Sequence, residues 1–306
     1  MLRYLLRRSF GAIPTLLVLI TISFFMMRVA PGGPFDANRR ATPEVVANLN
    51  KAYHLDESLV SQYGRYLWGV IRLDFGPSFK YRDYSVSELI WQGFPVSLEL
   101  GLWVTLLSTL AGVALGTVSA LRQNSLVDYG VMAVGMTGVA VPTFVVAPLA
   151  QLLFGVIWAL LPVGGWDGTA KTKILPIVAL ALPNIAYIAR LARGAMIEAL
   201  RSPHVRTARA KGLGPRLTIT RHAMIGGLLP VLSYLGPATA GIITGSVVIE
   251  KIFGIPGIGR YFVEAAANRD YTLVMGVVLF YGFLIILFNL LVDLVYGLID
   301  PKVRYD

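Results

Sequence analysis

The chain has 306 residues, of which 56% are hydrophobic and 14% are charged, and its mean hydropathy is +0.66. A soluble domain carries about 25% charged residues, so this composition leaves too little polar surface for a water-soluble globule and indicates a membrane protein. The formal net charge is +10, but the basic residues gather at the ends of apolar segments, which disfavours nucleic-acid binding. The chain has no cysteine, which excludes disulfides, thiol catalysis and cysteine-ligated metals.

Six segments are apolar and long enough to cross the roughly 30 Å of bilayer hydrocarbon, for which a helix needs about 20 residues. They are residues 9–29, 97–121, 129–161, 174–195, 226–249 and 273–299. The first segment is too long for a signal peptide and lacks a suitable cleavage sequence, so we expect a retained helix. The third is long enough to span with a tilt, or with a kink at Pro142 and Pro148.

Basic residues mark one side of the membrane. Arg3, Arg7 and Arg8 precede the first span, Arg122 follows the second, and six arginines and lysines lie between residues 198 and 224. Bases in the short loops of the other side are accompanied by acids. The positive-inside rule therefore predicts that both termini and the 198–224 connection are cytoplasmic.

Residues 31–96 form a long outer loop with strong helical signals. Thr42-Pro43-Glu44 is typical of a helix start, and apolar residues recur at helical spacing between residues 59 and 71. Ser85-Val86-Ser87-Glu88 fits a capping box before a further helix. We expect a small external helical subdomain whose apolar faces pack on the membrane helices or help to dock an external partner.

Several kinds of chemistry find no support in the sequence. No Gly-Lys dipeptide occurs, so there is no P-loop for ATP, and the zinc-protease and serine-hydrolase motifs are absent. The histidines, His54, His204 and His222, form no metal-ligand pattern. Asp293 in the last span is the one acid considered for a proton relay, which leaves an ion-coupled secondary transporter as an alternative. No catalytic residue and no metal site are predicted.

Two glycine pairs and several prolines shape the spans. Gly112-xxx-Gly116 and Gly241-xxx-Gly245 each place two small residues on one helix face, which favours close helix packing within the chain. Prolines recur inside the spans, and they free backbone carbonyls that must be buried in protein or line a wet cavity. Kinked helices around an aqueous path would suit a route for a polar substrate.

The connection after the fourth span is basic and is expected to contain a short helix. Ser202 suits the cap position, Pro203 the first helical position and Gly212 the stop. Thr207, Ala208 and Ala210 are small, which suits a protein groove better than burial among acyl chains. A chain without an ATP site that presents such a helix indicates a partner that supplies energy.

The run of residues 205–213, followed by Arg221-His222-Ala223 and Leu229-Pro230, resembles the coupling loop of permease subunits of binding-protein-dependent ABC importers. The closest resemblance is to the branch that imports oligopeptides, dipeptides and, in some members, nickel complexes. Further matches occur along the chain, at residues 1–8, 13–14, 30–32, 74–78, 95–97, 250–253, 256–259, 268–271 and 300–304. Residues 24–28 and 74–80 most resemble oligopeptide permeases. The coupling loop departs from the wider superfamily in having Arg206 where an acid is usual, and Met224-Ile225 in place of Leu-Pro.

The resemblance implies an all-α membrane protein with the type I permease fold and about six transmembrane helices. Residues 1–30 would form the cytoplasmic end and the first span, residues 31–96 the external subdomain, and residues 97–306 a permease core with five spans. Within that core, residues 198–224 would form the cytoplasmic coupling loop. The protein would be a multi-pass protein of the bacterial cytoplasmic (inner) membrane.

The resemblance also implies a division of labour. The residues expected to fit a groove on a cytoplasmic ATPase are Arg206, Thr207, Ala208, Arg209, Ala210, Lys211 and Gly212. The residues expected to contact the binding protein or form an outer gate are Glu250, Phe253, Pro256, Gly257 and Gly259. The partners would be a second permease, two ATPases that bind ATP and Mg²⁺, and an external peptide-binding protein. The chain itself would bind no cofactor, would not be an enzyme, and would move peptides, with dipeptides or nickel complexes as alternative cargo.

Overall fold

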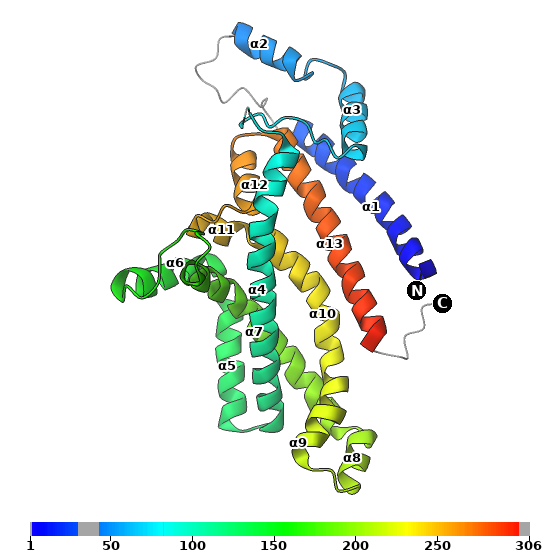
Figure 1. Cartoon of the computed structure of the whole chain (residues 1–306), viewed down its shortest axis with the longest axis vertical. Helices are drawn as coiled ribbons and strands as arrows, with labels where there is room; N and C mark the ends of the chain where they lie inside the picture. The colour runs from blue at the N-terminus through cyan, green and yellow to red at the C-terminus, as the bar shows by residue number, and fades with distance from the viewer. Residues whose placement is uncertain (1, 30–42, 82, 300–306) are drawn as a thin grey trace. The chain divides into compact units, whose positions relative to one another are not determined.

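The computed structural model describes residues 2–29, 43–81 and 83–299, so Thr42 of the expected helix start lies outside the described residues. The described part of the chain is built almost entirely of helices (Figure 1). In chain order they are α1 (Leu2–Val29), α2 (Pro43–Ala52), α3 (Leu59–Ile71), α4 (Val86–Leu121), α5 (Leu126–Ala140), α6 (Thr143–Ala150), the π-helix η1 (Gln151–Ile157), α7 (Ala170–Arg201), α8 (Pro203–Ala210), α9 (Pro215–Thr218), the π-helix η2 (Ile219–Ala223), α10 (Met224–Gly245), α11 (Val247–Phe253), α12 (Ile258–Ala267) and α13 (Tyr271–Ile299).

The helices belong to two compact units. Unit 1 contains Leu98–Ile255 and Leu287–Asp306, and unit 2 contains Leu2–Ser97 and Pro256–Ile286. The long helices α4 and α13 each contribute residues to both units.

Five helical stretches are long and apolar enough to cross a membrane, and a bent pair of shorter helices brings the number to as many as six within the described residues. The stretches are Phe10–Val29, Val86–Leu121, Ala170–Arg201, Pro215–Gly245 and Tyr271–Val295, with Leu126–Ala140 and Thr143–Ile157 as the bent pair. The predicted all-α fold with about six spans is confirmed. The helix predicted to end at residue 249 ends at Gly245 instead, and α11 begins after Ser246.

Helix α4 begins eleven residues before the second predicted span. The predicted capping box is present, because the backbone N–H of Ser85 donates to Glu88 Oε2 at 2.8 Å and that of Glu88 donates to Ser85 Oγ at 3.2 Å. The helix that starts there continues through Pro95 to Leu121. The separation of this helix from the second span was therefore wrong, since one proline did not end it.

We predict that Ser85→Ala destabilises the start of α4 by about 1 kcal/mol, because Ser85 Oγ satisfies an N–H that the helix itself cannot. Amide hydrogen exchange will measure the effect. The Glu88 amide should exchange several-fold faster, while amides in the last turn of α4 serve as an internal control and keep their rates. Unchanged exchange at Glu88 would contradict the capping role.

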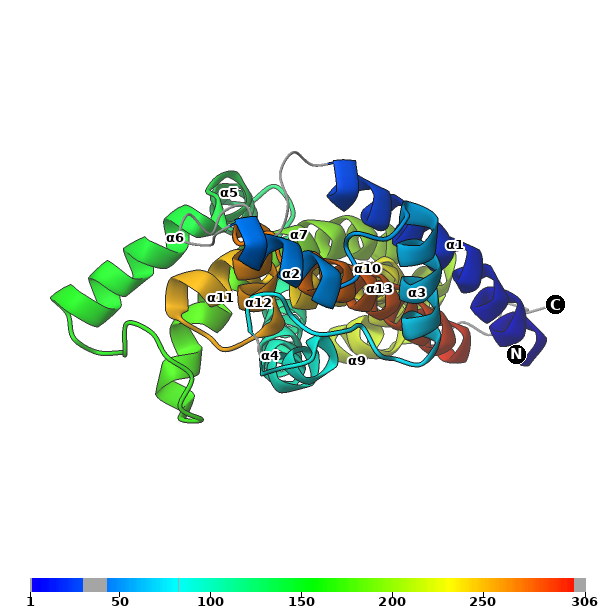
Figure 2. The same cartoon turned by 90° about the horizontal axis from the view of Figure 1, so that it is seen from above.

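The third predicted span contains a sharp corner. Helices α5 and α6 meet at an angle of 100°, and Figure 2 shows α6 leading away from α5. Val141 is extended, with φ −89° and ψ 117°, as the residue before a proline prefers. Of the two alternatives, a tilt or a kink, the kink at Pro142 is thus confirmed. Pro148 lies inside α6 without ending it.

In unit 1, α7 packs against α5, α6 and α10, and α4 approaches it through its glycine pair. A Cβ on Gly112 would lie 2.7 Å from Ile188 Cβ, and one on Gly116 would lie 2.4 Å from the carbonyl oxygen of Ala189. Larger residues would separate the two helices, so packing within the chain explains this motif. Gly241 and Gly245 have no described atom within 4 Å of a Cβ, so such packing does not explain the second pair.

In unit 2, the outer-loop helices pack on the ends of the membrane helices. Phe24 of α1 contacts the ring of Tyr63 in α3, with 5.3 Å between centroids, and Thr21 shares a 2.6 Å hydrogen bond with the Tyr63 hydroxyl. Tyr271 and Met275 of α13 complete this cluster. The expectation that the apolar faces of the outer loop pack on membrane helices is therefore confirmed.

Candidate functional site

Helix α8 lies between α7 and α9, near the lower ends of α7 and α10 in Figure 1. Ser202 occupies the cap position with an extended backbone, and Pro203 follows at the first helical position, as predicted. The Ser202 hydroxyl does not cap the helix, however. It donates to the carbonyl of Ala199 at 2.6 Å, so it closes the end of α7 instead.

Helix α8 ends in a Schellman motif. Gly212 has φ +77°, its N–H donates to Arg209 O at 3.0 Å, and the N–H of Leu213 donates to Ala208 O at 3.3 Å. Both bonds satisfy carbonyls at the helix end. Glycine adopts this left-handed conformation at little cost, so the predicted stop at Gly212 is confirmed.

The two faces of α8 differ sharply. Val205 and Ala208 are buried in a cluster with Ala120 of α4, Met196 of α7 and Ala223 of η2. The opposite face is exposed, and it carries Arg206, Thr207, Arg209, Ala210, Lys211 and Gly212. Six of the seven predicted coupling residues are thus available to a partner, while Ala208 anchors the helix.

The exposed face of α8 is basic. Among the described residues, Arg206, Arg209 and Lys211 make no ion pair with a carboxylate. On the same side of the connection, His204 Nε2 lies 3.2 Å from the carbonyl oxygen of His222 and ties α8 to η2. A rigid basic helix end of this kind is complementary to an acidic protein surface.

A buried ion pair in unit 1 joins α5 to α7, and it was not predicted from the sequence. Asp128 of α5 is 1% exposed and accepts from Arg193 of α7 through Nε and Nη2, both at 2.6 Å. The Ser119 hydroxyl and the N–H of Asn124, the latter at 2.9 Å, also donate to it. The pair therefore fastens the turn between α4 and α5 to α7, about one turn of α7 before Met196 of the α8 cluster.

The residues expected at the outer gate are mostly buried within their own unit. In unit 1, Glu250 is fully buried and accepts from Ser246 Oγ at 2.6 Å, and Phe253 is 1% exposed. In unit 2, Gly257 and Gly259 are buried, and only Pro256 is exposed. Of these five residues, the structure presents Pro256 alone to a partner.

Two acids close to the start of α13 accept hydrogen bonds from other residues of unit 2. Asp270 is fully buried and accepts from the Ser78 hydroxyl and from the N–H of Lys80 at 3.1 Å. The Tyr81 hydroxyl donates to Glu264, and burial together with this hydrogen bond raises the pKa of Tyr81. The segment 78–81 is thereby held to α12 and the start of α13.

Comparison with known proteins assigns the class. The fold resembles the solved structure titled "Crystal structure of an amino acid ABC transporter with histidines", with a TM-score of 0.53 and 16% identity over 69% of this chain and 94% of the other. It also resembles the structure titled "Inward facing conformations of the MetNI methionine ABC transporter", with a TM-score of 0.54 and 15% identity over 69% of this chain and 96% of the other. At this level of identity, the likeness shows that the chain shares the fold of these two proteins.

The chain belongs to the family described as binding-protein-dependent transport system inner membrane component, which matches residues 112–305, and the N-terminal family of the same membrane components matches residues 1–101. It is 56% identical to the oligopeptide transport system permease protein OppB of Escherichia coli (strain K12) over 100% of both chains. It is 51% identical to the OppB of Haemophilus influenzae, again over 100% of both chains. The dipeptide transport system permease protein DppB of Bacillus subtilis (strain 168) is 43% identical over 99% of this chain and 98% of the other. The chain is thus a multi-pass inner membrane permease of the oligopeptide and dipeptide branch.

Proposed function

We propose that the chain is the translocation subunit of an ATP-driven importer that carries peptides, chiefly oligopeptides, into the cytoplasm. The support is the identity of 56% to an oligopeptide permease over the full length of both chains, against 43% to a dipeptide permease. The chain forms part of the path and catalyses no reaction. Transport then alternates between an outward-open and an inward-open cavity.

We base the proposal about energy coupling on the geometry of α8. The apolar face of α8 is buried through Val205 and Ala208, so the helix is held in place and its basic face is exposed. A cytoplasmic ATPase with an acidic groove would receive Arg206, Arg209 and Lys211, and movement of that groove would be transmitted to α4, α7 and η2. ATP and Mg²⁺ would be bound by two such partners.

We expect the rest of the assembly to follow the pattern of binding-protein-dependent transport systems. The helix α8 and both termini would be cytoplasmic, and the outer-loop helices α2 and α3 would face the periplasm. A homologous second permease would complete the path, and an external peptide-binding protein would deliver cargo. Pro256 is the residue of the proposed outer-gate set through which direct contact is expected, because its neighbours in that set are buried.

The test is peptide uptake into proteoliposomes. We expect no uptake by this chain alone, and uptake when the second permease, the ATPases and the binding protein are present with ATP on the ATPase side. Replacing ATP with a non-hydrolysable analogue should reduce uptake to background, which controls for passive leakage. Uptake by the chain alone under an ion gradient would overturn the proposal and make Asp293 the residue to study.

A further inference from the structure

Unit 2 contains a cavity of about 260 Å³. This corresponds to roughly eight or nine water molecules at about 30 Å³ each, and lies just below the usual range of small-molecule sites. Its wall comes from the end of α1, the turn before α3, α3 itself, residues 74–79 and the start of α13. Aromatic rings form much of the wall, namely those of Phe24, Tyr53, Tyr66 and Phe79.

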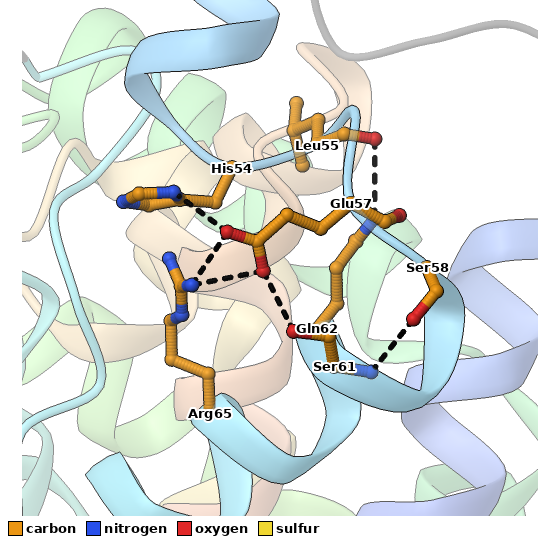
Figure 3. A network of polar contacts seen from close by, with 7 residues as sticks. All are labelled: His54, Leu55, Glu57, Ser58, Ser61, Gln62 and Arg65. Atoms are coloured by element: carbon orange, nitrogen blue, oxygen red, sulfur yellow. Dashed lines mark hydrogen bonds and ion pairs between the residues drawn. The ribbon is translucent and has the colours of Figure 1, made fainter.

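Two other residues that line the cavity, Arg65 and His54, already have a partner in Glu57. Arg65 Nη2 donates to both carboxylate oxygens of Glu57, at 2.6 and 2.8 Å, and His54 Nδ1 lies 3.0 Å from Glu57 Oε1 (Figure 3). The Ser61 hydroxyl also donates to Glu57, at 2.8 Å. The hydrogen bond from Ser61, then those from Arg65, lower the pKa of Glu57, so this acid is ionised at neutral pH. The charge of Arg65 is therefore already neutralised by Glu57.

Arg28, at the end of α1, is different. Among the described residues it makes no ion pair and no hydrogen bond, and its Nε is buried without a partner. Its guanidinium carbon lies 5.0 Å from the ring centroid of Phe24 and 5.3 Å from that of Tyr271. Ring faces attract a cation, but they do not replace the pair of hydrogen bonds that a guanidinium can donate to a carboxylate.

A second polar residue in the wall is also incompletely paired. Gln62 Nε2 donates to the carbonyls of Leu55 at 3.1 Å and Glu57 at 2.9 Å, which fixes the orientation of the amide. Its Oε1 is buried without a partner in the described part of the chain. The wall thus combines an unpaired cation, an unpaired acceptor and aromatic rings, which together suit a ligand with an anionic end, an N–H donor and an apolar or aromatic side chain.

We propose that this cavity binds the carboxyl-terminal end of a short peptide, whose carboxylate pairs with Arg28 while its last side chain lies against the aromatic rings. The inference rests on the proposed function, because the ligand is the cargo, and it gives the permease a cargo site of its own. Most of the wall comes from segments outside the candidate spans, which favours a ligand from water over a lipid.

The experiment measures binding of a fluorescent-labelled tripeptide to the complete transporter, without binding protein, in phosphatidylcholine nanodiscs. We expect Arg28→Gln to weaken binding about tenfold or more, since a charge-assisted pair is lost. Amidation of the peptide's C-terminus should weaken binding to the unaltered protein to the same extent, and this arm needs no substitution. The matched control is Arg72→Gln, because Arg72 also lies over an aromatic ring, Trp68 at 4.5 Å, but does not line the cavity.

Each outcome decides the proposal. Equal affinity for the acid and the amide peptide overturns it, as does equal weakening by the Arg72 substitution. Native mass spectrometry tests for lipid. If the unaltered protein retains a phospholipid that the Arg28 variant loses, and no peptide binds, the cavity is a lipid site and the proposal is overturned. Failure of the proposed function is distinguishable, because the complete transporter with its binding protein would then import no peptide at all.

Discussion

Gly212→Asp is expected to abolish peptide uptake while leaving the chain folded in the membrane. Gly212 is exposed, has φ +77°, and has no described atom within 4 Å of a Cβ. An aspartate there meets no steric conflict within the chain, and the left-handed backbone costs roughly 1 kcal/mol for a residue of this kind. The new carboxylate would lie beside Lys211, at the end of the face that we propose docks on the ATPase, and would weaken the match to an acidic groove.

The controls for this substitution separate charge from conformation. Asparagine has nearly the same shape as aspartate and a similar tolerance for positive φ, but no charge. We therefore expect Gly212→Asn to retain a substantial part of the uptake. Uptake in proteoliposomes, ATPase stimulation and co-purification of the ATPases should all be measured. Normal transport by Gly212→Asp, with the variant present in normal amounts, would refute the assigned role of the loop.

Arg193→Ala is expected to destabilise unit 1 by about 3 kcal/mol, because it leaves a buried carboxylate without its cation. Asp128 is 1% exposed, whereas the Arg193 side chain is 26% exposed and can reach water when its partner is removed. Asp128→Ala should therefore be less destabilising than Arg193→Ala. Thermal unfolding of the purified complex in detergent, followed by the loss of monodisperse protein, measures both variants.

A double-mutant cycle tests whether the two side chains act as a pair. Removing both charges eliminates the uncompensated carboxylate, so Asp128→Ala with Arg193→Ala should be more stable than Arg193→Ala alone. If the two single effects simply add, the ion pair does not couple the α4–α5 turn to α7. Arg190, on α7 and over the ring of Tyr187 at 5.8 Å, provides a control arginine outside the pair.

The short helix α8 could be predicted closely because its signals are local. Pro203 restricts the backbone at the start of α8, and Gly212 permits the left-handed turn at its end. The capping box at Ser85 was predictable for the same reason. The helix that starts there was nevertheless assigned to the outer loop, and the second span was expected to start at residue 97, whereas α4 runs through both without a break.

The parts that were missed depend on contacts between residues far apart in the sequence. Asp128 was placed in the turn before a span starting at residue 129, and no local pattern relates it to Arg193, 65 residues later. A clue was present, since Ser125-x-x-Asp128 has capping-box spacing, and the Asp128 N–H does donate to Ser125 Oγ at 3.4 Å. Likewise the burial of Glu250 follows from Ser246 and the surrounding fold, which charge patterning cannot show. The predicted division of the chain into residues 1–30, 31–96 and 97–306 stays a prediction.

The corner at Pro142 has a consequence for the surrounding lipid. Helix α5 has 15 residues and at 1.5 Å per residue extends about 22 Å, which is less than the roughly 30 Å thickness of the hydrocarbon. Its outward residues include Val134 and Met136, which are 75% and 68% exposed and require an apolar environment. Where lipid contacts α5, we therefore expect its acyl chains to shorten or tilt, so that the bilayer is locally thinner. The activity of the complete transporter should consequently depend on acyl-chain length.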